Sequence, residues 1–233
     1  MTVPGAGGLV TNHQRGTTVL LASASPARLG VLRTAGLDPL VTVSGVDEDA
    51  VLAAFVNRPP ADQIIGLAEA KADAVVTRIL AGELPEIARQ DLVVIGCDSM
   101  LLIDGELKGK PADAGQARLL WRQMAGREAL LITGHAVRRL INGLLSATAA
   151  DSRSSIVRMA TPTEREVEAY IATGEPLAVA GGLTIDGFGG WFVESVDGDP
   201  SNVLGISLPL TRRLLTDIGV GVTDLWRSPS SPA

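Results

Sequence analysis

The segment Leu20–Arg28 constrains the fold of this chain more than any other. Its apolar start is typical of a buried strand, and a turn of small residues leads to Pro26, which is favoured at the first position of a helix. Arg28 then lies in the first turn of that helix. The free N–H groups of a turn and a helix start attract anions, and an arginine adds a forked cation. The segment therefore predicts a phosphate-binding element, although a strand-to-helix turn with no ligand has the same pattern.

A second apolar run, Asp91–Ile95, predicts a buried strand that ends at Gly96-Cys97-Asp98-Ser99 and places a carboxylate at its C-terminal end. Strand character resumes at residues 100–103. Asp104-Gly105 is typical of a two-residue hairpin turn, after which residues 106–111 return along the strand.

This hairpin would bring a carboxylate and a lysine together. If Asp104 and Gly105 form the turn, Ser99 faces Lys110, and Asp98 is the diagonal neighbour of Lys110, within reach of a long side chain. One interpretation is an ion pair on the surface, which contributes little to stability. The glycines and the proline around the pair favour a close approach of the backbone instead.

The rest of the chain alternates helices and strands, which predicts an α/β fold with a mixed sheet. Capping residues and terminal glycines predict helices at about 62–80, 113–124 and 163–173. A last helix is expected at 209–218. Strands are expected at 128–138, in one or two pieces at 143–159, and at 191–194. The glycine-dense loop before the last strand fits either a set of turns and bulges or a loop close to a flat ligand.

The composition fits a compact enzyme and excludes several classes of protein. A chain of 233 residues, 46% of them hydrophobic, is long enough for one or two domains with a full core. The net charge of -6 argues against nucleic-acid binding, although a nucleotide needs only a few local cations. No apolar run reaches the roughly 20 residues that span a bilayer. We therefore expect neither a nucleic-acid nor a membrane partner, and a location in the cytoplasm.

The ends of the chain predict one catalytic domain between two tails. Residues 1–16 lack the basic start and apolar centre of a signal peptide and predict a flexible N-terminal extension. Residues 228–233, rich in serine and proline, predict a disordered tail. The catalytic domain would occupy residues 17–227.

The few cysteines and histidines limit the possible chemistry. Cys97 is the single cysteine, which excludes an internal disulfide, and we interpret it as a small buried strand residue rather than a nucleophile. His13 and His135 do not have the spacing of a zinc site. Any metal should therefore be a hard cation held by carboxylates, such as Mg²⁺ or Mn²⁺.

Together with three further segments, these stretches resemble the Maf family of nucleoside triphosphate pyrophosphatases. The family pattern begins with Ser-x-Ser-Pro-Arg-Arg, an acidic pair and a lysine in a helix. It continues with Gly-x-Asp-Thr, Gly-Lys-Pro and Gly-Asp-x-x-Asn-Val-x-Gly-Leu-Pro. The matching segments occur here in that order between Thr18 and Val220, at 23–28, 46–48, 67–72, 96–99, 109–111, 197–205 and 208–210.

The resemblance implies an inosine-triphosphatase-like fold, in which helices flank a mixed sheet and two lobes enclose a nucleotide-binding cleft. It also implies a homodimer. The implied reaction is the hydrolysis of a nucleoside triphosphate to the monophosphate and pyrophosphate, by attack of water on the α-phosphorus with the help of Mg²⁺ or Mn²⁺.

The carboxylates of the matching motifs take defined roles under this resemblance. Asp98 would accept the proton of the attacking water, and Asp47, Glu48 and Asp98 are available to hold the metal. Ser23 is expected to donate a hydrogen bond to a phosphate.

Three basic residues are candidates to offset the negative charge that develops on the phosphoryl oxygens: Arg28, Lys71 and Lys110. Without the family pattern, Lys71 would be interpreted as a solvated lysine on a helix surface.

The residues that set base specificity in the family differ here. Arg, Thr and Gln occupy three such positions in one branch, which acts on thymidine and uridine triphosphates, and Trp, Gln and Glu occupy them in a branch acting on 7-methyl-guanosine triphosphate. The matching residues are Ala27, Ser99 and Asp186. An ionised aspartate only accepts hydrogen bonds, so Asp186 would favour a base edge rich in donors, unless it merely caps a glycine turn. Ala27 would leave room for a broader range of bases.

Two other functions compete with an enzyme that clears nucleotides from the pool. The first is a nucleotide-binding regulator of cell division, an idea attached to the family through an effect on septum formation. It would not need Asp98, Lys71, Lys110 and Arg28 together. The second, a nucleotidyltransferase, would require a glycine-rich loop after the first strand, which this sequence lacks.

Overall fold

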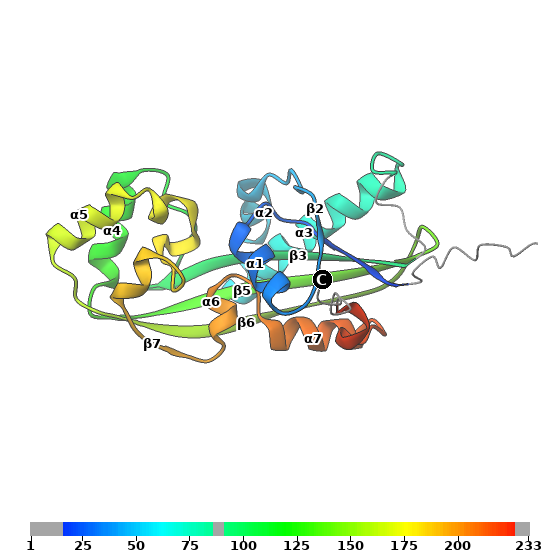
Figure 1. Ribbon diagram of the computed structural model, residues 1–233. Coiled ribbons are helices and arrows are strands. Elements are labelled where there is room, and N and C mark those ends of the chain that lie inside the picture. Colours follow the sequence, from blue (N-terminus) through cyan, green and yellow to red (C-terminus); the bar gives the residue numbers. More distant parts are fainter. Residues whose placement is uncertain (1–15, 86–90, 227–233) are drawn as a thin grey trace, which may run out of the picture.

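The computed structural model describes residues 16–85 and 91–226. Within these ranges the chain forms a mixed sheet with helices on both faces, which confirms the predicted fold class (Figure 1). Residues 1–15 of the predicted extension, the predicted tail 228–233 and residues 86–90 and 227 lie outside the described residues. In the described ranges, no helix is long and apolar enough to cross a membrane.

The sheet has seven strands in the order β2-β1-β3-β5-β6-β7, and β4 pairs with one end of β3. β1 pairs in parallel with β2 and β3, whereas the other pairings are antiparallel. The strands are β1 (Thr18–Leu21), β2 (Leu40–Val41), β3 (Asp91–Ile103), β4 (Glu106–Lys108), β5 (Glu128–Ile141), β6 (Leu144–Met159) and β7 (Val193–Asp197).

The helices form two groups, one at each end of the long strands β3, β5 and β6 (Figure 1). The first lobe contains α1 (Pro26–Thr34), α2 (Glu48–Phe55), α3 (Pro60–Leu80), α7 (Leu208–Asp217) and the 3-10 helix η4 (Val222–Leu225). The second contains α4 (Ala114–Met124), α5 (Glu164–Ala172), η1 (Glu175–Ala178), η2 (Ala180–Gly182) and η3 (Phe188–Phe192), while α6 (Pro200–Val203) leads back to the first.

Helix α3 lies directly on the sheet because two glycines let the backbones approach. A Cβ on Gly96 of β3 would lie 2.3 Å from the carbonyl oxygen of Ala68, and one on Gly134 of β5 would lie 2.3 Å from that of Ile64. Side chains on a strand alternate between its faces, so Asp98, two residues after Gly96, faces α3 as well. This packing places Lys71 of α3 beside Asp98.

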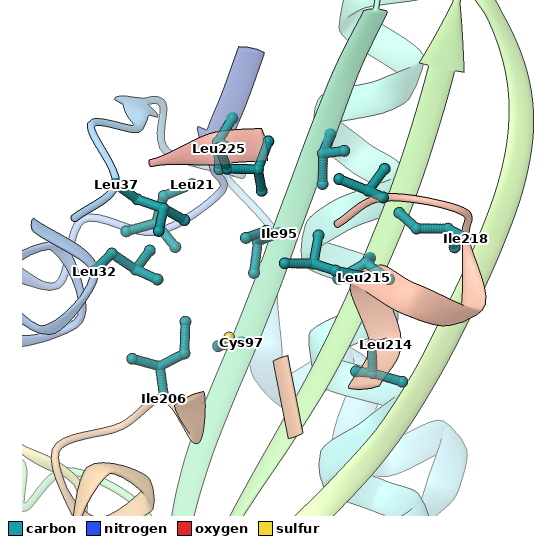
Figure 2. Packing of buried hydrophobic residues seen from close by; sticks show 14 of the residues in the cluster. Leu21, Leu32, Leu37, Ile95, Cys97, Ile206, Leu214, Leu215, Ile218 and Leu225 are labelled. Carbon is teal, nitrogen blue, oxygen red and sulfur yellow. The ribbon is translucent and has the colours of Figure 1, made fainter. Parts of the chain in front are cut away.

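The opposite face of the same strands carries a separate aliphatic core (Figure 2). Leu32 of α1 and Leu214 of α7 pack there against Ile95 and Cys97 of β3. Cys97 is fully buried, as the sequence predicts. Because Ser99 is on the same face as Cys97, it points toward α1 rather than toward α3.

A gap in the pairing of β3 opens one edge of the sheet. β1 pairs with β3 up to Ile95, and β4 pairs with it only from Leu101 onward, so neither strand covers residues 96–100. The strand itself is continuous through this gap. The prediction that Asp98 ends a strand is therefore wrong: β5 pairs with β3 along its other edge and keeps it extended.

Most local predictions are confirmed. Ile103 pairs with Glu106 across a turn in which Asp104 and Gly105 have positive φ, and Asp113 caps α4. Three bounds differ. α3 starts at Pro60 rather than at Asp62, and β5 runs to Ile141 rather than to residue 138. Residues 191–192 belong to η3, because Phe192 turns inward onto the ring of Trp121.

Candidate active site

A cleft of about 790 Å³ opens at the uncovered edge of β3, between the two lobes. The first lobe contributes the β1–α1 turn, α2 and α3, and the second contributes residues 178–186. Ser23, Arg28, Lys71, Asp98, Ser99 and Lys110 all line this cleft. Side chains from both faces of β3 therefore meet in one cavity, although they lie far apart in the sequence.

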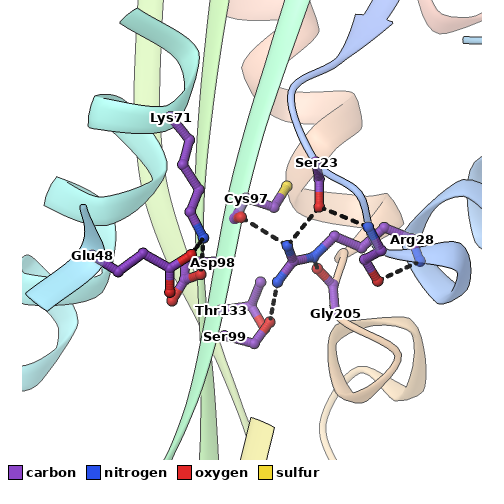
Figure 3. A network of polar contacts seen from close by, with 10 residues as sticks. Ser23, Arg28, Glu48, Lys71, Cys97, Asp98, Ser99, Thr133 and Gly205 are labelled. Carbon is purple, nitrogen blue, oxygen red and sulfur yellow. Dashed lines mark hydrogen bonds and ion pairs between the residues drawn. The ribbon is translucent and has the colours of Figure 1, made fainter. Parts of the chain in front are cut away.

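Arg28 is held in place by hydrogen bonds to neutral oxygens (Figure 3). Its Nε donates to the Gly205 carbonyl at 2.8 Å, Nη1 donates to Ser23 Oγ at 3.0 Å and to the Cys97 carbonyl at 2.9 Å, and Nη2 donates to Ser99 Oγ at 3.2 Å. Four of its five N–H groups are thus used. Among the described residues no carboxylate forms an ion pair with Arg28.

The hydroxyl of Ser23 is oriented by the same contacts. Its oxygen accepts from Ser25 N at 3.2 Å and from Arg28 Nη1 at 3.0 Å. A serine hydroxyl has two lone pairs and one proton, so both acceptor positions are filled and the proton is left to donate. Ser23 can therefore donate to an anion in the cleft.

The hydroxyl of Ser99 is oriented in the opposite sense. Thr133 Oγ1 of β5 donates to the Asn202 carbonyl at 3.1 Å, which uses its one proton. In the 3.0 Å contact between Ser99 and Thr133, Ser99 must therefore be the donor. Because Ser99 also accepts from Arg28, only one lone pair of its oxygen remains for a ligand.

On the other face of β3, Lys71 lies between two carboxylates (Figure 3). Its ammonium contacts Asp98 directly and lies 2.7 Å from Glu48 Oε1. The side chains of Lys71 and Asp98 are buried, whereas that of Glu48 is half exposed. Helix α3 turns this lysine inward, so the interpretation as a solvated surface lysine is wrong.

Two sequence predictions need correction. The predicted neighbour of Asp98 is Lys110, but Lys71 occupies that place because β4 ends at Lys108 and the chain leaves β3 before Lys110, which lines the cleft as an exposed residue. Asp47 does not join Glu48 and Asp98 either. Its carboxylate caps α2 by accepting from Ala50 N at 3.0 Å.

A divalent cation fits the remaining pair of carboxylates. In the part of the chain that the structure describes, no group of three or more acidic, histidine or cysteine side chains could hold a metal. Glu48 and Asp98, however, both contact one ammonium and so lie close together. Mg²⁺ is commonly held by one or two carboxylates with substrate phosphates completing its shell, and this donor set meets that requirement.

The two remaining specificity candidates lie on opposite sides of the cleft. Ala27 is in α1, and Asp186 follows η2 in the second lobe. Asp186 is exposed. The carboxylate that orders the glycine turn beside it belongs to Glu175, which accepts from the backbone of Phe188 and Gly189. The alternative in which Asp186 caps this turn is not supported.

Two buried titratable groups next to the cleft are neutral. Burial raises the pKa of the Cys97 thiol to about 12, so it is not a nucleophile at neutral pH. Burial also lowers the pKa of His135 to about 4. His135 Nε2 accepts from Ser207 N at 2.8 Å, and Nδ1 then carries the proton toward the Thr133 carbonyl.

Sequence reasoning missed Thr133, Glu175 and the Gly205 carbonyl. Thr133 contacts Ser99, 34 positions away, Glu175 reaches Gly189, 14 positions away, and Gly205 acts through its backbone carbonyl, which the residue type does not reveal. A capping pattern or a register argument reaches only neighbours along a helix or across a hairpin.

Comparison with known proteins agrees with this geometry. The family model for Maf-like proteins matches residues 18–218. A Nocardia farcinica protein named nucleoside triphosphate pyrophosphatase is 57% identical over 215 residues, covering 92% of this chain and 99% of the relative. Two further relatives carry the same name. The Saccharopolyspora erythraea protein is 57% identical over 90% of this chain and 97% of the relative. The Mycolicibacterium vanbaalenii protein is 50% identical over 91% of this chain and 99% of the relative.

Proposed function

Because the chain belongs to the Maf-like protein family, we propose that it is a nucleoside triphosphate pyrophosphatase that clears particular nucleotides from the pool. Relatives that match it over almost their whole length carry that name. The observation that carries the proposal is the pairing, within one cleft, of an arginine that has no carboxylate partner in residues 16–85 and 91–226 and a lysine between two carboxylates.

The reaction consumes water and releases pyrophosphate. A water oxygen attacks the α-phosphorus, the bond from that phosphorus to the oxygen bridging it to the β-phosphate breaks, and the bridging oxygen leaves with the electron pair. One water proton moves to Asp98, whose Oδ1 accepts from Lys71. Lys71 holds that carboxylate in a fixed orientation, which proton transfer in the transition state requires.

Arg28 and Ser23 form the phosphate-binding side of the site. Charge accumulates on the phosphoryl oxygens as the reaction proceeds, and a preorganised donor placed there stabilises it most effectively. Arg28 is preorganised by its four hydrogen bonds, and Ser23 has a proton left to donate. Lys110, which is exposed on the cleft wall, is a further cation for the leaving pyrophosphate.

Glu48 and Asp98 would hold Mg²⁺ or Mn²⁺. When bound, such an ion neutralises phosphate oxygens and lowers the pKa of a coordinated water. Glu48 is half exposed and can adjust its position, whereas Asp98 is fixed by burial in the centre of β3.

We also propose that the cleft prefers a base edge rich in hydrogen-bond donors. Ser99 offers a lone pair rather than a proton, and an ionised Asp186 only accepts. Guanine, cytosine and a methylated guanine present such edges. Asp186→Gln supplies a donor and should shift the preference toward uridine or thymidine triphosphate; an unchanged nucleotide profile would show that Asp186 does not contact the base.

The location and assembly of the enzyme remain part of the proposal. The family resemblance implies a homodimer, the lack of an apolar run of membrane-spanning length favours the cytoplasm, and the net charge of -6 disfavours a nucleic-acid partner. Light scattering of the purified protein should give twice the mass of the chain, and a mass of one chain would contradict the dimer.

The decisive experiment is to incubate the purified protein with Mg²⁺ and a panel of nucleoside triphosphates, and to assay pyrophosphate and orthophosphate separately. We expect equal amounts of pyrophosphate and nucleoside monophosphate. Orthophosphate with a nucleoside diphosphate would contradict attack at the α-phosphorus, and nucleotide binding without any product would favour a regulator over an enzyme.

A further inference from the structure

The Glu175 carboxylate accepts hydrogen bonds from α5, from Thr184 and from η3. It accepts from Tyr170 Oη of α5 at 3.0 Å and from the hydroxyl of Thr184. It also accepts from the backbone of η3, namely Phe188 N and Gly189 N, each at 3.0 Å. One side chain at the start of η1 thereby closes residues 175–189 into a loop.

Two glycines of this loop lie where a larger residue would clash with Glu175 or with its partner Tyr170. A Cβ on Gly187 would lie 2.5 Å from a carboxylate oxygen of Glu175, and one on Gly189 would lie 2.6 Å from the Tyr170 hydroxyl oxygen. A side chain at 187 would displace the Glu175 carboxylate, and one at 189 would displace Tyr170 or the Thr184 backbone. Contact with the Glu175 carboxylate therefore explains the glycine at 187, and close packing against Tyr170 and the Thr184 carbonyl explains the glycine at 189.

The charge of Glu175 is stabilised where it lies. Partial burial acts to raise its pKa, but the hydrogen bonds from Thr184, Gly189, Phe188 and Tyr170 outweigh burial and lower it. The carboxylate is therefore ionised at neutral pH, and an ionised acceptor makes stronger hydrogen bonds than a neutral one.

This loop forms the wall of the cleft opposite Arg28, Lys71 and Asp98. Residues 178–180, 183, 184 and 186 line the cleft from the second lobe, whereas Arg28, Lys71 and Asp98 line it from the first. The middle of the loop is held by other contacts: Gly181 N donates to the Gly109 carbonyl at 2.9 Å, and Trp121 Nε1 donates to the Gly182 carbonyl at 3.0 Å. Between residues 184 and 189, Ile185 packs against the apolar core of the second lobe, whereas Thr184, Phe188 and Gly189 donate hydrogen bonds to Glu175.

We propose that Glu175 is a positioning residue that fixes residues 184–189, and with them the groups that the cleft presents to the nucleobase. The proposal rests on the function given above, since phosphates held by Arg28 and the metal site leave the base to the opposite wall. Glu175 touches neither the phosphates nor the reacting water. It acts through Thr184 and Asp186, which line the cleft.

Binding of non-hydrolysable nucleotides tests this inference without requiring turnover. The probes are the α,β-methylene analogues of guanosine, cytidine and uridine triphosphates with Mg²⁺, measured by isothermal titration calorimetry on the full chain. We expect Glu175→Ala to weaken the best-bound analogue by about tenfold, as loss of several charge-assisted hydrogen bonds would, and to narrow the ratio between the best and the worst analogue.

Two variants grade the effect and one serves as a control. Glu175→Gln keeps an oxygen for Tyr170 and Thr184 but turns an NH₂ group toward Phe188 N, so its effect should be intermediate. Tyr170→Phe removes one donor and keeps the ring stacked edge-on against Trp121, so its effect should be the smallest. Glu166→Gln alters the capping box of α5, which does not line the cleft, and should leave both affinity and ratio unchanged.

Steady-state kinetics provide the second readout. For Glu175→Ala we expect KM to rise about tenfold while kcat stays within about threefold, because ground-state positioning is lost and the reacting groups remain.

Unchanged affinity of Glu175→Ala for the analogues would overturn the inference. An equal loss of affinity for all analogues, with their ratio preserved, would also overturn it, and so would failure of every analogue to bind the unmodified protein. If analogues bind but the parent nucleotides release no pyrophosphate, the proposed function fails while the role of Glu175 is still decided by the binding ratio. Glu175→Gln and Tyr170→Phe decide it if the alanine variant does not fold.

Discussion

The two cations at the centre of the cleft, Arg28 and Lys71, lie on opposite faces of β3 and have opposite surroundings. Arg28 donates to neutral oxygens, from two serines and two backbone carbonyls. Lys71 contacts two carboxylates. The first environment leaves a positive charge available to an anion, and the second holds more negative than positive groups. A basic residue can thus belong to a phosphate site or to a metal site, and its partners decide which.

Removing the metal should give the largest effect and should act on the Lys71 side alone. With excess chelator we expect complete loss of pyrophosphate release, restored by Mg²⁺ or Mn²⁺, because Glu48 and Asp98 would hold the ion. Nucleotide affinity should fall less, because the phosphate binding that we propose for Arg28 and Ser23 requires no metal. Full activity in excess chelator would contradict a metal site at Glu48 and Asp98.

Asp98→Asn keeps the size of the side chain and removes both a base and a metal ligand. General-base assistance alone is worth about a hundredfold or more, so kcat should fall at least that far. Circular dichroism should still report a folded protein. Asp104→Asn changes an exposed carboxylate at the hairpin turn of the same strand and should retain full activity. More than a tenth of wild-type turnover in Asp98→Asn would exclude Asp98 as the base.

Acid should lower the free energy of unfolding through His135, which lies near Arg28. The pKa of His135 is lowered to about 4 in the folded state, and about 6.5 is ordinary for an unfolded chain. Between these values the unfolded state binds more protons, so stability is present above about pH 6.5 and is lost as the pH falls toward 4. The loss is roughly 3 kcal/mol. Urea unfolding from pH 7 to pH 4 measures it, and His135→Gln should flatten the slope.

Arg28→Lys retains the charge but cannot reproduce the forked hydrogen bonds to Ser23, Ser99 and Gly205. We expect kcat/KM to fall about tenfold, which corresponds to about 1.4 kcal/mol. Arg33→Lys on the same helix, in an exposed ion pair with Asp38, is the matched control and should be silent. If both variants keep wild-type kcat/KM, charge alone suffices on this side.

Thr133→Val should give the smallest effect. The variant is nearly isosteric but leaves the Asn202 carbonyl and the Ser99 proton without their partner, at a cost of about 1–3 kcal/mol in stability. Ser99 can then rotate and donate into the cleft, so nucleotide preference should shift by a few fold. Thr148→Val, on an exposed part of β6, should change neither. An unchanged nucleotide preference in Thr133→Val would show that the Ser99 hydroxyl does not face the base.

The features that sequence predicts well are those set by neighbouring residues. Pro26 begins α1, Asp113 caps α4, and Asp104-Gly105 turns the hairpin. In each case the backbone geometry depends on a few adjacent positions, which explains why the α/β class and most element types could be predicted.

The features that sequence predicts poorly depend on packing. Gly96 suggests the end of a strand, yet the strand continues, because β5 holds it and α3 needs the space that a side chain would fill. The same packing turns Lys71 toward Asp98, 27 residues away. No local pattern carries that information, so hairpin register favoured Lys110 as the partner instead.

The three long strands that run through both lobes have a mechanical consequence. A flexible linker between the lobes would allow each lobe to unfold or rotate independently. Here β3, β5 and β6 are instead adjacent strands of one sheet that both lobes share. The lobes can therefore approach each other only if these three strands twist or if the loops on the cleft wall shift. Backbone amides at the two ends of β5 should therefore exchange with deuterium in a single cooperative opening.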